Sequence, residues 1–164
     1  MTVQERLAAL RSLMKEKHVD AYLVPTDDFH GSEYVGDYFK CRKYITGFTG
    51  SAGTAVITSD MAGLWTDGRY FIQAAQQLEG TTVTLFKMGE PKVPTVHEFL
   101  KDKLTEGMCL GFDGRCVSAA EAEELKSLLA DKNISFSVED DLIGEIWKNR
   151  PELSCEPVME LEEK

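Results

Sequence analysis

The stretch GTAVITSDMAGLWT, residues 53–66, decides the class of fold. Its two apolar runs, 53–58 and 62–66, have the length of β-strands, and Ser59 and Asp60 between them are typical of a turn. The spacing predicts an antiparallel hairpin. In the rest of the chain predicted helices and strands alternate, so this hairpin predicts a mixed sheet rather than a purely parallel one.

Regular patterns flank the hairpin on both sides. Apolar residues recur at helical spacing over residues 3–14, behind a predicted capping box of Thr2 and Glu5. Residues 21–24 form a continuous apolar run, which predicts a strand buried on both faces. Two more capping boxes are predicted, one in Thr95 and Glu98 and one in Ser118 and Glu121. Further helices are predicted over residues 69–78, 95–104, from 118 onward and up to Trp147, and further strands over residues 82–87, 108–112 and 134–138.

These elements predict one α/β domain with a mixed β-sheet and helices on both faces. Residues 134–138 alternate between apolar and polar, which predicts an edge strand. The periodic spacing of apolar residues stops after Trp147. Trp147 itself is expected to dock its helix onto the domain. We therefore expect a domain over residues 1–148 and a linker over residues 149–164, leading toward a second domain beyond this chain. Residues 139–164 carry −6 of the net charge of −10.

Composition excludes several classes of function. Hydrophobic residues make up 43% of the 164 residues, which is ordinary for a globular protein. No basic stripe collects phosphates, so nucleic acid is not an expected partner, and no apolar run approaches the ~20 residues of a membrane span. The four cysteines form no CxxC pair, which favours reduced thiols in a cytoplasmic protein.

No complete motif for metal, phosphate or nucleophilic chemistry stands in the chain. His97 and Glu98 begin a zinc-helix signature, but Lys101 occupies the position of the second histidine, so no metal site is expected. The glycines of residues 46–54 precede a predicted strand and lack a following lysine, which favours a tight loop over a phosphate site. Ser51 does not stand in a GxSxG elbow. No catalytic residue is therefore predicted.

Arg69 is the candidate binding residue. It follows the strand that ends at Trp65 and the turn of Asp67 and Gly68, so it is expected at the carboxyl end of a strand, where α/β sheets commonly bind ligands. Its planar guanidinium can hold a carboxylate or a peptide carbonyl. Spacing alone equally allows an exposed arginine in a surface ion pair.

Four ordered segments carry a family resemblance: DDFHGSEY (residues 27–34), RKYITGFTGSAGTAVIT (42–58), LWTDGRYFIQAAQQL (64–78) and LIGEIWKNRPELSCEPV (142–158). Together they resemble the amino-terminal domain of the creatinase, prolidase and aminopeptidase P group. The second and third segments resemble the three-domain aminopeptidase P branch most closely.

The resemblance implies a non-catalytic amino-terminal domain of an Xaa-Pro aminopeptidase, which removes the first residue of peptides with proline in second position. It implies that two divalent metals, usually manganese, lie in a carboxyl-terminal catalytic domain outside this chain, and that the whole protein is a homodimer. It matches Arg69 to a substrate-contacting arginine. The alternatives are a peptide-binding module without peptidase activity and a prolidase or creatinase relative.

Overall fold

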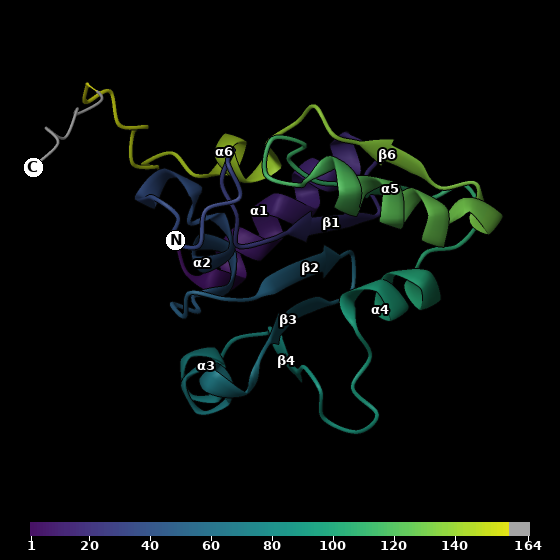
Figure 1. Cartoon of the computed structure of the whole chain (residues 1–164), viewed down its shortest axis with the longest axis horizontal. Helices are drawn as coiled ribbons and strands as arrows, with labels where there is room; N and C mark the ends of the chain where they lie inside the picture. The colour runs from purple at the N-terminus through teal and green to yellow at the C-terminus, as the bar shows by residue number, and fades with distance from the viewer. Residues whose placement is uncertain (158–164) are drawn as a thin grey trace, which may run out of the picture.

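A mixed sheet forms the centre of the structure, a computed structural model that describes residues 1–157 (Figure 1). Its strand order is β4-β3-β2-β1-β5-β6, which confirms both the mixed sheet and the edge position of the last strand. β2 runs antiparallel to β1 and β3, whereas the other neighbouring strands are parallel. The strands are β1 (Ala21–Val24), β2 (Thr54–Thr58), β3 (Ala62–Thr66), β4 (Thr84–Lys87), β5 (Cys109–Gly111) and β6 (Ser135–Ser137).

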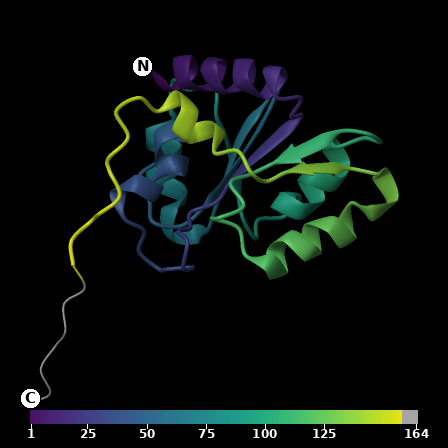
Figure 2. The ribbon, with the colours of Figure 1, turned by 90° about the horizontal axis from the view of Figure 1, so that it is seen from above.

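Helices cover both faces of this sheet, as predicted, and α1 and α5 lie on opposite sides of it (Figure 2). One apolar cluster packs α1, α2, α3 and α6 against the sheet, and the other packs α4 and α5 against the opposite face. The helices are α1 (Val3–Glu16), α2 (Cys41–Thr46), α3 (Phe71–Leu78), α4 (Val96–Lys103), α5 (Ala119–Leu128) and α6 (Leu142–Ile146), with 3-10 turns η1 (Asp37–Phe39), η2 (Gly68–Tyr70) and η3 (Ala130–Lys132).

The strand β1 shows why a continuous apolar run suits the middle of the sheet. Tyr22 and Val24 belong to one apolar cluster, and Ala21 and Leu23 belong to the other. Because successive side chains point to opposite faces, both faces of a strand covered by helices must be apolar. Full burial of a side chain such as Leu23 stabilises the fold by about 2 kcal/mol.

The structure differs from the local expectations at three places. The helix expected from Arg69 begins as the turn η2, and α3 starts only at Phe71. The helix α2 was not predicted, because it spans six residues and has no side-chain cap. The third capping box is only half formed: the Ser118 hydroxyl accepts from the Glu121 amide, but the Glu121 carboxylate bonds to His97 instead.

Trp147 and Arg150 fasten the segment that follows α6 to the domain. The Trp147 ring stacks on Tyr44 with 4.5 Å between centroids, so the predicted docking of its helix is confirmed. The Arg150 side chain is only 10% exposed, whereas residues 151–157 are exposed. The division into a domain over 1–148 and a linker over 149–164 stays a prediction, and residues 158–164 lie outside the described part.

Within residues 1–157, each helix is too short or too polar to cross a membrane.

Candidate functional site

The carboxyl ends of the parallel strands meet at one edge of the sheet. Because β2 is antiparallel to both neighbours, β1 and β3 run in the same direction, and β4, β5 and β6 follow it. The loops after Val24, Thr66 and Gly111 therefore lie at this edge. Ligands commonly bind at the carboxyl ends of strands in such sheets, so side chains at this edge are candidates for a binding site.

Arg69 lies at this edge in a turn that fixes its guanidinium. The Asp67 carboxylate accepts from the Arg69 amide at 3.0 Å and from Arg69 Nε and Nη2, both at 2.9 Å. These bonds from Arg69 lower the pKa of Asp67 to about 2. The Arg69 side chain remains 70% exposed. The arginine is thus both a surface ion pair and a pre-oriented cation, and the structure by itself leaves its role in substrate binding a prediction.

Arg42 shapes the loop beside that turn. Its Nε donates to Thr26 Oγ1 at 2.7 Å, and its Nη1 and Nη2 donate to the carbonyls of Phe48 and Gly50. The residue is 4% exposed, and its burial lowers its pKa to about 10. Gly53 completes the loop at φ +150°, where a Cβ would lie 2.8 Å from the Trp65 carbonyl. The glycines therefore serve a tight loop, as predicted.

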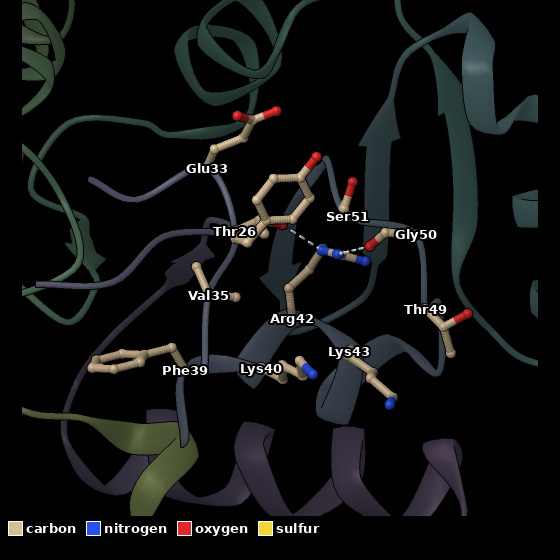
Figure 3. Close-up of a pocket in the computed structure, with 11 residues that line it drawn as sticks. Thr26, Glu33, Val35, Phe39, Lys40, Arg42, Lys43, Thr49, Gly50 and Ser51 are labelled. Carbon is tan, nitrogen blue, oxygen red and sulfur yellow. Dashed lines mark hydrogen bonds between the residues drawn. The ribbon is translucent and has the colours of Figure 1, made fainter. Parts of the chain in front are cut away.

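A pocket of about 310 Å³, here called the edge pocket, opens between this loop and residues 26–43 (Figure 3). Figure 3 shows Arg42 between Thr26 and Gly50. Both apolar and polar side chains line the edge pocket, among them Glu33, Tyr34, Val35, Phe39, Lys43 and Ser51.

Arg69 does not line the edge pocket but adjoins it. The Ser51 hydroxyl, which does line it, is 2.6 Å from the Tyr70 hydroxyl, and the Arg69 Cζ lies 5.3 Å from the centroid of the Tyr70 ring. A pocket that combines apolar side chains with a few polar groups is typical of a ligand-binding site. Within residues 1–157 the hydroxyls of Ser51 and Tyr70 bond to each other and not to a histidine.

One group of potential metal ligands occurs in the described part of the chain. One ligand atom each from His97, Glu121 and Glu124 lies within 4.8 Å of the others, on α4 and α5 and away from the edge pocket. His97 Nε2 is already hydrogen-bonded to Glu121 at 2.8 Å. Three such donors do not fit a centre of two bridged ions, which needs several carboxylates. We therefore derive no metal chemistry from them.

Comparison with known proteins identifies the family. The profile of the Creatinase/Prolidase N-terminal domain matches residues 6–143. The chain belongs to this family. Aminopeptidase P2 of Arabidopsis thaliana is 46% identical over 153 residues, covering 91% of this chain and 21% of that protein. A probable Xaa-Pro aminopeptidase P of Pyricularia oryzae is 40% identical over 167 residues, covering all of this chain and 27% of that protein. This family member thus spans about a quarter of the length of these relatives.

Solved structures agree with this membership. The X-prolyl aminopeptidase of Caenorhabditis elegans, described as a cytosolic enzyme with a di-nuclear active site, has a TM-score of 0.89 and 37% identity, covering 99% of this chain and 28% of that one. The N-terminal domain of the cytoplasmic peptidase PepQ of Mycobacterium tuberculosis has a TM-score of 0.61 and 26% identity, and the match covers 86% of this chain and 97% of that one. The predicted family and fold are confirmed.

The tertiary structure adds site residues that sequence reasoning missed. Arg42 and Tyr70 both stand inside segments that carried the resemblance, yet neither was given a role. Each acts through a partner at least 16 residues away in the chain: Thr26 for Arg42 and Ser51 for Tyr70. A signal existed in Arg42, a charged residue four positions before the glycine-rich stretch of residues 46–54.

Proposed function

We propose that this chain is the non-catalytic amino-terminal domain of a cytoplasmic, metal-dependent Xaa-Pro aminopeptidase, and that it contributes Arg69 to the substrate site. In this proposal two divalent metals, expected to be manganese, lie in the catalytic domain of the complete protein, which is a homodimer. The names of the relatives and the partial coverage of their lengths support this arrangement. The chain alone is expected to show no peptidase activity.

The geometry of Arg69 is the observation that carries the proposed role. Its guanidinium is exposed, yet two bonds to Asp67 already fix its direction beside the edge pocket. A pre-oriented arginine loses less conformational entropy on binding than a free one. Its Nη1 has no hydrogen-bond partner within residues 1–157, so it can donate to a carbonyl or carboxylate of the peptide.

Steady-state kinetics of the complete protein test this role. Loss of one charge-assisted hydrogen bond costs about 1.5–3 kcal/mol, so Arg69→Ala should lower kcat/KM for an Xaa-Pro peptide by about 10- to 150-fold. The kcat/KM of Arg69→Lys should lie between those of the unchanged protein and Arg69→Ala, because lysine keeps the charge without the planar fork. A rise in KM alone indicates uniform binding, and a fall in kcat indicates alignment of the scissile bond.

Arg11→Ala is the matched control. Arg11 donates to the Thr58 carbonyl at 2.9 Å, at the opposite end of β2 from the edge pocket, and its loss should leave kcat/KM unchanged. Unchanged kcat/KM in both Arg69 variants, with metal content and folding preserved, would show that Arg69 does not bind substrate. Metal analysis and light scattering of the complete protein check the expected manganese and the dimer.

A further inference from the structure

Arg150, which lies just before the exposed residues 151–157, binds the loop that lines the edge pocket. Arg150 Nε donates to the Tyr38 carbonyl at 2.8 Å, and its Cζ lies 3.7 Å from the centroid of the Tyr38 ring. Arg150 Nη1 also pairs with the Asp141 carboxylate, and the two side chains are only 10% and 15% exposed. A charge pair this buried is directional and hard to replace by water.

Asp141 joins three segments through one carboxylate. Its Oδ1 accepts from the Gly144 amide at 2.8 Å and caps α6, while its Oδ2 meets Arg150 and Arg115 Nη2, the latter at 3.4 Å. Arg115 in turn lies with its Cζ 4.9 Å from the centroid of the Phe29 ring. Arg150, which pairs with Asp141, and Arg115, which is held mainly by two 2.9 Å bonds to the Asp113 carboxylate, therefore contact two aromatic rings of the same loop.

That loop, residues 27–39 and here called the pocket loop, supplies Glu33, Tyr34, Val35 and Phe39 to the edge pocket. The Phe39 ring packs edge-on against Phe29 and Tyr38, with centroids 4.7 and 5.0 Å apart. The rings held by the two arginines thus lie behind a residue of the pocket wall.

The pocket loop depends on these contacts because it pairs with no strand of the sheet. Its regular structure is limited to the turn η1, and the Asp28 carboxylate, which accepts from the amides of His30 and Ser32, acts only locally. Ordering such a segment costs conformational entropy, so side-chain contacts from outside the loop decide how fully it is ordered.

We propose that Arg150 and Asp141 are positioning residues for the substrate site. They fasten the exit of the chain from this domain to the pocket loop, so the start of the segment that follows and the wall of the edge pocket move as one body. The inference rests on the proposed function for its catalytic consequence, but the mechanical link itself does not.

Asp141→Asn separates the link from the helix cap. The amide oxygen of asparagine still accepts from the Gly144 amide, whereas the charge that pairs with Arg150 is lost; the Asp113 carboxylate still holds Arg115. Hydrogen exchange by mass spectrometry on the complete protein should show the amides of residues 29–39 exchanging about tenfold faster, and β1 and β2 unchanged. Arg150→Ala should do the same. Asp60→Asn, which loses the 2.9 Å pair with Lys103 at a distant turn, is the matched control and should change nothing in this loop.

Kinetics of the same variants test the catalytic consequence. Asp141→Asn should raise KM for an Xaa-Pro peptide several-fold with kcat nearly unchanged, because the loop is less often in its binding position while the catalytic groups are untouched. Faster loop exchange in a complete protein that cleaves no Xaa-Pro peptide would support the link and overturn the proposed function. Unchanged loop exchange in both variants would overturn the link, and faster exchange with an unchanged KM in an active enzyme would overturn the positioning role.

Discussion

Replacing Arg42 by methionine tests whether this buried cation holds the glycine-rich loop. Methionine has a similar length and can fill the space without donating hydrogen bonds. The change would leave the carbonyls of Phe48 and Gly50 without their donor in a buried region, whereas the Thr26 hydroxyl would keep its own bond to the Gly53 carbonyl. No carboxylate pairs with Arg42 within residues 1–157, so no buried negative charge is left behind.

The expected loss of folding stability in Arg42→Met follows from these contacts. Two buried carbonyls without donors cost about 1–3 kcal/mol each, which gives about 2–6 kcal/mol. Removing a buried cation recovers part of its desolvation cost, so we expect the lower half of that range, about 3 kcal/mol. Arg42→Lys should lose less, because one ammonium group can replace part of the network.

Urea unfolding of the 164-residue chain measures this loss. Trp65, which is fully buried against Phe86, reports the transition by its fluorescence. A loss of stability should lower the urea concentration at the midpoint of unfolding while the dependence of the unfolding free energy on urea concentration stays the same. Arg11→Met is the control, since Arg11 makes one bond to the Thr58 carbonyl and its loss should cost about 1 kcal/mol or less. An Arg42→Met loss under about 1 kcal/mol would refute the reasoning, because it would show that the loop needs no arginine.

Two further predictions concern ionisation. The pKa of Asp67 is about 2, below its ordinary value. The Asp67–Arg69 pair should therefore make its full contribution to folding stability above about pH 4, and this contribution should be lost as the pH falls through about 2. NMR titration of the Asp67 carboxyl carbon should give that midpoint, and Arg69→Ala should raise it toward the ordinary value of about 3.9 without reaching it, because the amide of residue 69 still donates to the carboxylate; equal midpoints would contradict the pairing. Burial raises the pKa of the Cys41 thiol to about 12, so iodoacetamide should label exposed Cys155 at least tenfold faster than Cys41 in the native chain. Mass spectrometry measures both rates, and comparable labelling would show that Cys41 is accessible.

Elements whose contacts lie within a few residues could be predicted from the sequence. The boxes of Thr2 with Glu5 and of Thr95 with Glu98 formed as expected, because both partners are three residues apart and their geometry depends only on the helix start. The apolar run of β1 correctly predicted burial on two faces. The locked turn of Asp67 and Arg69 is local in the same sense, with partners two residues apart.

Contacts between distant segments were decided by the tertiary structure. The Glu121 carboxylate was expected to bond within its own helix, yet it meets His97 from α4, 24 residues away. The strand order and the position of β1 between β2 and β5 likewise follow from packing, which no local pattern encodes.

The same division holds at the site. Sequence alone placed Arg69 after a strand-ending turn, and family resemblance attached a role to it. Only the fold brings Ser51 to Tyr70, Thr26 to Arg42 and the exit of the chain to the pocket loop. The physical reason is that a hydrogen bond within a turn is set by a few backbone angles, whereas a contact between segments depends on strand register and on how both faces of the sheet are packed.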